Sequence, residues 1–250
     1  MSTTPNYVEF SDPRLVALYD TLNAFGDDSE FFCQQAQKLG AKTIIDLGCG
    51  TGLLTVELAK RGHKMIGIEP ASAMLDIARG KPHAEEVQWI QGSFEKMEAL
   101  EADMVLMTSH VAQFFLEDKE WRAMLQAVHK TLKPGGHLVF DIRRLTNPPF
   151  VGWPTEDTRR KFEDTDAGPV EWWFNFLEIK DGRVRYELHY FFARSSEKVV
   201  SVNELAFRSQ EEITQALSEA GFKVETVYGD WDGSMATPTS PEMIFVASRN

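Results

Sequence analysis

The sequence predicts an α/β fold built around a doubly wound, mostly parallel sheet, and three adjacent features predict it. Residues 43–47 form a short, β-branched, apolar run that is typical of a buried strand. A glycine-rich turn over residues 48–52 and a helical run over residues 53–60 follow at once. Residues 63–69 form a second strand that ends in the acid Glu69. In doubly wound sheets such a turn lies at the carboxyl edge, where ligands bind.

The glycine turn carries the main evidence for a ligand. Gly48, Gly50 and Gly52 can adopt positive φ and place no Cβ in the path of a ligand. Glu69 lies about twenty residues after Gly50, the spacing at which an acid can accept both hydroxyls of a ribose. Leu53 replaces the small residue of a dinucleotide fingerprint, and the Lys-Ser/Thr pair of a phosphate-binding loop is absent. The turn therefore favours a nucleoside without phosphates.

These residues resemble a known family, the seven-stranded, class I S-adenosylmethionine-dependent methyltransferases. The first two motifs of that family are matched by Asp46-Leu47-Gly48-Cys49-Gly50-Thr51-Gly52 and by Glu69. Residues 102–107 resemble its fourth strand, and Pro134-Gly135-Gly136 resembles its turn into the fifth. The resemblance spans about the first 140 residues. It implies a seven-stranded sheet, S-adenosyl-L-methionine as cofactor and S-adenosyl-L-homocysteine as product.

The resemblance also implies which residues contact the cofactor. Asp46 and the amides of the glycine turn are expected to hold its amino-acid part, and Glu69 its ribose. Ser93 stands where the family usually carries Asp or Asn beside the adenine, and the amide of Phe94 is an alternative contact. Tyr19 is expected either to close over the cofactor or to be an ordinary packing residue. The full predicted set is Tyr19, Asp46, Gly48, Cys49, Gly50, Gly52, Glu69, Ser93, Phe94 and Thr108.

His110 is the candidate catalytic residue, because it follows the fourth strand at the same carboxyl edge. Its unperturbed pKa of about 6.5 suits a general base that takes a proton from a substrate hydroxyl or amine. The alternative is a histidine that orients a loop or packs against the cofactor, since many methyl transfers need no base. No metal site is expected, because Cys33 and Cys49 form no metal-binding pair and are predicted to be free thiols.

The second half of the chain predicts an insertion after the fifth strand. Residues 171–179, 184–192 and 199–207 read as three antiparallel strands, and Asp181-Gly182 is typical of a hairpin turn. We expect a cofactor-binding domain over residues 1–146 and 208–250 and a small antiparallel β-sheet over residues 147–207. Its aromatic residues fit a lid over an apolar substrate, a homodimer interface or the packing of the sheet itself.

Local signals predict the remaining elements. Residues 1–10 are expected to be loose. Helices are expected after the capping residues Asp12, Asp27 or Asp28, Ser72, Asp118 and Ser209. Residues 222–227 and 243–247 are predicted to form the closing strands. Asn147-Pro148-Pro149-Phe150 resembles the tetrapeptide of methyltransferases that modify adenine or glutamine amides. In those enzymes it follows the fourth strand, so its place after the fifth favours a simple turn.

Composition narrows the function further. The formal net charge is −12, which argues against binding to a nucleic-acid backbone. No segment of the sequence is typical of a signal peptide or a membrane span, so we expect a cytoplasmic protein. The prediction is a methyltransferase that acts on a small molecule by in-line displacement, mainly through proximity and orientation. The alternatives are a cofactor-binding but catalytically silent partner protein and a nicotinamide-dependent oxidoreductase.

Overall fold

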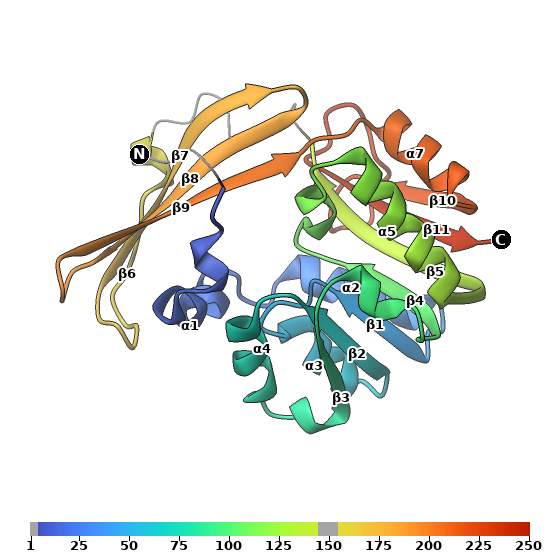
Figure 1. The fold of residues 1–250 in the computed structure, drawn as a ribbon, viewed down its shortest axis with the longest axis horizontal. Coiled ribbons are helices and arrows are strands. Elements are labelled where there is room, and N and C mark those ends of the chain that lie inside the picture. The colour runs from blue at the N-terminus through green and yellow to red at the C-terminus, as the bar shows by residue number, and fades with distance from the viewer. Residues whose placement is uncertain (1–4, 145–154) are drawn as a thin grey trace.

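The computed structural model describes residues 5–144 and 155–250, and it has two sheets (Figure 1). The larger sheet has seven strands in the order β10-β11-β5-β4-β1-β2-β3. The five neighbouring strands β5, β4, β1, β2 and β3 are parallel. Strand β11 runs antiparallel to β5, and β10 runs antiparallel to β11. The predicted fold class, a mostly parallel seven-stranded sheet with a separate antiparallel sheet, is confirmed.

The strands of the larger sheet closely follow the runs predicted at residues 43–47, 63–69, 102–107, 222–227 and 243–247. Their bounds are β1 (Thr43–Leu47), β2 (Lys64–Glu69), β3 (Val87–Gln91), β4 (Ala102–Met107), β5 (Leu132–Arg143), β10 (Phe222–Tyr228) and β11 (Glu242–Arg249). Strand β5 begins earlier than the Pro134-Gly135-Gly136 turn, because Leu132 already pairs with Ala102. The register then shifts between Ala102 and Met104. The turn is therefore an irregularity within a strand, not its starting point.

The helices cover both faces of the larger sheet. Their bounds are α1 (Pro13–Leu22), α2 (Asp27–Lys38), α3 (Leu53–Lys60), α4 (Ser72–Arg79), α5 (Asp118–Thr131), α6 (Thr155–Thr158) and α7 (Gln210–Glu219), with short 3₁₀ turns η1 (Val8–Phe10), η2 (Ala84–Glu86), η3 (Phe94–Met97) and η4 (Val111–Phe114). Ile44 packs with residues of α2 and α3, and its neighbour Ile45 packs with residues of α5 and α7. Successive residues of a strand point to opposite faces, so one apolar run supplies two cores.

Two of the predicted helix caps are confirmed and three are wrong. The carboxylate of Asp12 accepts from the amide of Arg14, and Ser209 forms a capping box with Glu212. Ser72 and Asp118 are instead the first residues of their helices, and α2 begins at Asp27 after Gly26. In all three the preceding residue has the extended backbone of a cap, so the helix begins at the residue that was expected to cap it.

The second sheet lies between β5 and α7 in the chain and has four strands, not the expected three. They are β6 (Arg160–Phe162), β7 (Val170–Lys180), β8 (Arg183–Phe192) and β9 (Glu197–Ala206), in that order. The additional strand β6 pairs Arg160 with Trp172 and Phe162 with Val170. Its three residues are too few to show an alternating pattern, which is why the sequence predicts a loop there.

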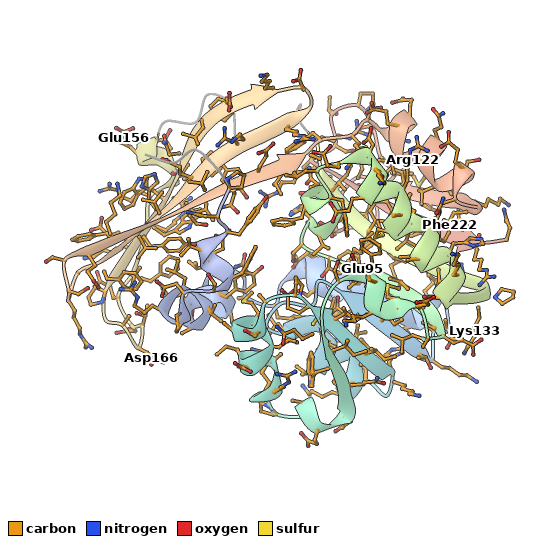
Figure 2. All side chains as sticks on the ribbon, in the orientation of Figure 1. Glu95, Arg122, Lys133, Glu156, Asp166 and Phe222 are labelled. Atoms are coloured by element: carbon orange, nitrogen blue, oxygen red, sulfur yellow. The ribbon has the colours of Figure 1, made fainter. Side chains whose placement is uncertain are left out.

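One face of the second sheet is turned toward α1. The side chains that register places on this inner face include Val170, Trp172, Phe174, Phe176, Val184, Tyr186, Leu188, Tyr190, Phe192, Val199, Ser201, Asn203 and Leu205. Leu15 and Leu18 of α1 pack in one cluster with Tyr190. In Figure 1, α1 lies between the second sheet and α4. Side chains of both sheets project into the space between them (Figure 2).

The outer face of the second sheet is more polar. The ring of Trp173 stacks on His189 with centroids 5.0 Å apart, and the cations of Arg159 and Lys198 lie over it. Asn147-Pro148-Pro149-Phe150 and the expected domain boundary near residue 147 lie outside the described residues. Within the described part of the chain, no helix is both long and apolar enough to cross a membrane.

Candidate functional site

A cavity of about 990 Å³ lies between the carboxyl edge of the larger sheet, the segment from η1 to α1 and the inner face of the second sheet. This volume is at the upper end of the range for small-molecule sites. It has room for a nucleoside-sized ligand and a second small molecule together. The predicted residues that line it are Tyr19, Asp46, Gly48, Cys49, Gly50, Glu69, Ser93, Thr108 and His110.

Asp46, the penultimate residue of β1, is a buried acid, and one of its two carboxylate oxygens has no partner among the described residues. Its side chain is 1% exposed, and the hydroxyl of Thr55 donates to Oδ2 over 2.6 Å. Oδ1 has no hydrogen-bond partner among the described residues. Burial, with a smaller effect from Glu69, raises the pKa of Asp46 to about 6. A cationic or hydrogen-bond-donating group in the cavity would satisfy Oδ1, which is what the ammonium of an amino acid offers.

Glu69 is fixed at the end of β2 by two backbone amides. The amide of Gly50 donates to Oε2 over 3.1 Å, and that of Ala71 donates to Oε1 over 2.9 Å. Burial raises the pKa of Glu69, and the two amide bonds oppose that shift. Each carboxylate oxygen can accept a second bond, so both remain able to accept from a diol. Gly50 and Glu69 thus hold one another in place beside the cavity.

The amides of the glycine turn are already used within the chain. Those of Gly48 and Cys49 both donate to the carbonyl of Ile68, over 2.8 and 3.1 Å. The amide of Gly52 donates to the carbonyl of Cys49, and that of Gly50 to Glu69. These four amides thus have partners within the chain, and their contact with a ligand stays a prediction. The turn also offers close approach, because a Cβ at Gly50 would meet no atom nearer than 3.5 Å.

Two predicted residues do not line the cavity. A Cβ at Gly52 would lie 2.5 Å from the ring of Trp89, so this glycine makes room for a core side chain. A Cβ at Gly67 would meet the same ring at 2.6 Å. Phe94 packs on Phe115 with centroids 5.9 Å apart and belongs to the core. The structure therefore gives Gly52 and the side chain of Phe94 packing roles.

The N-terminal segment is attached to the glycine turn. The hydroxyl of Thr51 donates to Asp20 of α1, and Lys81 pairs with the same carboxylate. The backbone of Asn6 donates to the carbonyl of Val202 in β9, over 2.9 Å. Residues 5–10 are therefore held against the second sheet, and the expectation of a loose segment is wrong for this part. The segment closes the side of the cavity on which Tyr19 lies.

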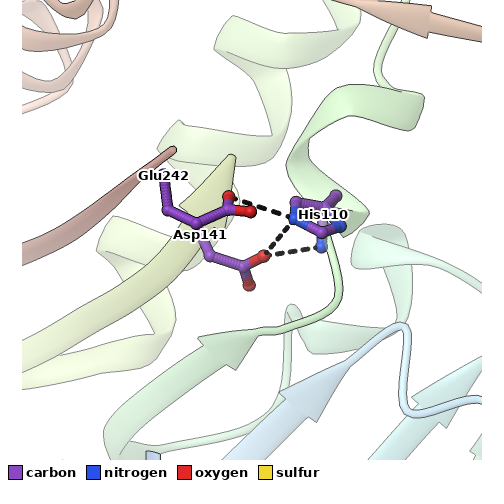
Figure 3. Close-up of side chains that lie close together, drawn as sticks. All are labelled: His110, Asp141 and Glu242. Carbon is purple, nitrogen blue, oxygen red and sulfur yellow. Dashed lines mark hydrogen bonds and ion pairs between the residues drawn. The ribbon is translucent and has the colours of Figure 1, made fainter. Parts of the chain in front are cut away.

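His110 meets two carboxyl groups at the carboxyl edge (Figure 3). Its Nε2 lies 3.2 Å from Oδ2 of Asp141 and 3.2 Å from Oε2 of Glu242. Its backbone amide also donates to Asp141 over 3.0 Å. Ser109 and His110 both have positive φ, at 54° and 65°, which is uncommon outside glycine. We call these three side chains, of His110, Asp141 and Glu242, the acid–histidine cluster.

The sequence did not single out Glu242. Strand β11 is antiparallel to its neighbour β5, so its first residue lies at the same edge as the last residues of the parallel strands. Glu242 pairs in register with Arg143, next to Asp141 and Ile142. The sequence signal is an acid directly before the last predicted strand, residues 243–247. That signal becomes meaningful once the strand order is known.

Burial dominates the electrostatics of the acid–histidine cluster. It lowers the pKa of His110 to about 4, although Asp141 opposes the shift. It raises the pKa of Asp141 to about 6 and that of Glu242 to about 8. Near neutral pH the imidazole is thus uncharged and Glu242 is largely protonated. The three ligand atoms also lie within 4.8 Å of one another, so the cluster can hold a cation as well as share protons.

Comparisons with known proteins agree with this geometry. Residues 44–136 match the methyltransferase domain family. A candidate methyltransferase of Geobacillus sp. (strain WCH70) is 29% identical over 86% of this chain and 88% of its own. The structure of an S-adenosylmethionine-dependent methyltransferase from Clostridium acetobutylicum has a TM-score of 0.77 at 16% identity, over 93% of this chain and 96% of its own.

A further solved structure contains the cofactor. It is that of S-adenosylmethionine-bound CalS10, an amino pentose methyltransferase from Micromonospora echinaspora. It has a TM-score of 0.69 at 22% identity, over 93% of this chain and 97% of its own. The likeness extends over both sheets, because these alignments cover nearly the whole chain.

Proposed function

We propose that this chain is a class I S-adenosylmethionine-dependent methyltransferase and that it methylates a small molecule. The observation that carries the proposal is one continuous cavity, which joins the glycine turn and its acids to the inner face of the second sheet. One end has the polar groups that suit an amino acid and a ribose, and the other has an aromatic wall. A cofactor and a small acceptor would then lie in one enclosure, with reacting atoms held close together.

We assign the cofactor to the end that carries Asp46 and Glu69. When bound, S-adenosylmethionine supplies an electrophilic methyl carbon on a positively charged sulfur. Asp46 would hold the amino-acid part through Oδ1, the atom that has no partner among the described residues. Glu69 would accept from the ribose diol, and Ser93 and Thr108 line the wall nearby. Tyr19 covers this end from α1.

We assign His110 to the acceptor. Since its Nε2 faces Asp141 and Glu242, the ring is placed as an N–H donor toward them and Nδ1 is left as its acceptor atom. An uncharged imidazole can take a proton from a hydroxyl or amine as the methyl group is transferred. The carboxylate of Asp141 would stabilise the resulting imidazolium. For an acceptor that arrives without a proton to lose, His110 would only position the nucleophile.

Turnover of S-adenosylmethionine tests the proposal. The enzyme is incubated with the cofactor and with separate sets of small amines, small alcohols, peptides and RNA, and S-adenosylhomocysteine is quantified. We expect product formation with members of the small-molecule sets. Turnover with peptide or RNA alone would contradict the small-molecule assignment. Binding of S-adenosylhomocysteine without turnover of any acceptor would favour the catalytically silent partner protein. The match to the methyltransferase domain family argues against the alternative of a nicotinamide-dependent oxidoreductase.

Three further predictions belong with this proposal. We propose that residues 1–146 and 208–250 form the cofactor domain and residues 147–207 the substrate subdomain. We also propose a cytoplasmic location, in keeping with the two free cysteines, Cys33 and Cys49. A homodimer through the second sheet stays a prediction that size-exclusion chromatography with light scattering can test. Its inner-face aromatic residues serve the cavity, so only the more polar outer face is available for such a contact.

A further inference from the structure

A buried acid, Glu9, lies in the aromatic part of the cavity and is assigned neither to the cofactor nor to proton transfer. Glu9 lies in η1, is 5% exposed and lines the cavity. Nothing in the sequence selects Glu9, because residues 1–10 are predicted to be loose. We propose that Glu9 binds a cationic amine group of the substrate, beneath the inner face of the second sheet. This assignment rests on the proposed small-molecule function and names the chemical class of its substrate.

Glu9 is supported by hydrogen bonds and has no counter-ion among the described residues. The hydroxyl of Ser201 in β9 donates to its Oε2, and the amide of Asn203 donates in turn to Ser201 over 3.3 Å. None of the ion pairs described for residues 5–144 and 155–250 includes Glu9. Burial raises the pKa of Glu9, and its hydrogen bonds oppose that shift. A buried carboxylate of this kind gains most from a cation that enters the cavity.

The surroundings of Glu9 suit a cation as well. The negative charge of Glu9 contributes to raising the pKa values of four tyrosines that line the same cavity. They are Tyr7, Tyr19, Tyr186 and Tyr190. The faces of aromatic rings attract ammonium groups, and this attraction grows when water is excluded. A carboxylate and several aromatic rings around one space thus select a protonated amine over an alcohol or an acid.

The register of the second sheet places Ser201 and Asn203, the residues that support Glu9, on its inner face. Ser201 pairs with Leu188 and Asn203 pairs with Tyr186, so both polar residues share the inner face with the aromatic side chains. Both are 0% exposed, and Oδ1 of Asn203 has no partner among the described residues. Apolar residues would pack there at lower cost, because buried polar groups are expensive unless they are satisfied. If Glu9 binds a ligand, these polar residues serve to hold its carboxylate in place.

A matched pair of probes tests the assignment. The protein is saturated with S-adenosylhomocysteine and titrated calorimetrically with 2-phenylethylamine and with 2-phenylethanol, which are similar in shape. We expect the amine to bind at least tenfold more tightly than the alcohol. In Glu9→Gln, which keeps the shape of the side chain, this preference should fall to about one. Glu85→Gln is the control, because Glu85 is exposed and lies outside the cavity, and it should retain the preference.

Several outcomes would overturn the proposal. They are equal binding of amine and alcohol, a preference that survives Glu9→Gln, and no binding of the amine at all. Affinity for S-adenosylhomocysteine should be the same in the wild type and in Glu9→Gln. Its absence in the wild type would contradict the proposed function and not only the role of Glu9. If Glu9→Gln does not fold, Ser201→Ala replaces it, and we then expect amine binding to weaken severalfold with alcohol binding unchanged.

Discussion

Buried carboxyl groups set the chemistry of this protein at the level of single residues. Asp46, Glu69, Asp141 and Glu9 are each less than 9% exposed, and burial raises the pKa of each. A fold tolerates such groups when a ligand compensates for them, since an unsatisfied buried carboxylate lowers stability. Because these four acids line one cavity, we infer a ligand that is rich in cationic and hydrogen-bond-donating groups.

The ribose contact can be tested at Glu69. We predict that Glu69→Ala weakens binding of S-adenosylhomocysteine by about 2–4 kcal/mol, because charge-assisted hydrogen bonds are lost. Isothermal titration calorimetry measures the change. Glu85→Ala, an exposed acid outside the cavity, is the matched control and should bind normally. An unchanged affinity in Glu69→Ala would refute the ribose role.

The proton-accepting role of His110 is separable from cofactor binding. We predict that His110→Ala lowers kcat by about 10²–10⁴-fold for an acceptor that must lose a proton. The affinity for S-adenosylhomocysteine should stay nearly constant, because the role assigned to His110 concerns the acceptor. Steady-state kinetics and calorimetry on the same preparations supply both numbers. Loss of cofactor binding in this variant would mean that His110 forms part of the cofactor wall.

Glu242 makes stability depend on pH. Its pKa in the folded protein is raised to about 8 from an ordinary value near 4.5. Between these two pH values the folded state therefore binds more protons than the unfolded state. The free energy of unfolding must then fall as pH rises through this window. His110 and Asp141 have their shifts below pH 6.5 and act in opposite directions there.

Between pH 6.5 and 8 we therefore predict a loss of up to about 2 kcal/mol in the free energy of unfolding. In Glu242→Gln, which cannot ionise, this loss should be absent. Urea denaturation at several pH values, without ligand, measures both proteins. The same slope in the two proteins would show that Glu242 is not the group that titrates.

At the level of elements, the short turn between β1 and α3 must both leave space for a ligand and pack against the core. Its outer side stays open at Gly50, and its inner side must clear the ring of Trp89 at Gly52. Gly52 also has a φ of +72°. The glycine pattern therefore reflects ligand access at one position and core packing at another. A sequence motif reports both without distinguishing them.

A pair of substitutions separates packing from backbone strain. Gly52→Ala adds a Cβ 2.5 Å from Trp89 in a backbone conformation with φ of +72°. Gly62→Ala has the strain alone, because φ there is +91° and no atom lies within 4 Å. We predict a loss of about 1–2 kcal/mol for Gly62→Ala and about 1–3 kcal/mol more for Gly52→Ala. Equal values from urea denaturation would contradict the packing role of Trp89.

For the whole molecule, the sequence predicts most of the larger sheet and only part of the site. Apolar, β-branched runs such as residues 43–47 determine strands locally, and topology places the residues that end or follow the parallel strands at one edge. Glu69 and His110 could therefore be found. Glu242 and Glu9 could not, since their roles depend on an antiparallel strand order and on a segment held by distant contacts. Strand β6 was missed for the same reason, because its pairing with β7 defines it.

The crystal structure of the complex with S-adenosylhomocysteine tests the central claim, a shared enclosure for cofactor and acceptor. We predict that the amino group of the ligand lies within hydrogen-bond distance of Oδ1 of Asp46 and that its ribose hydroxyls contact Glu69. Its sulfur should face the part of the cavity between His110 and the inner face of the second sheet. A ligand whose ribose lies away from Glu69, or whose sulfur faces away from that space, would contradict the account.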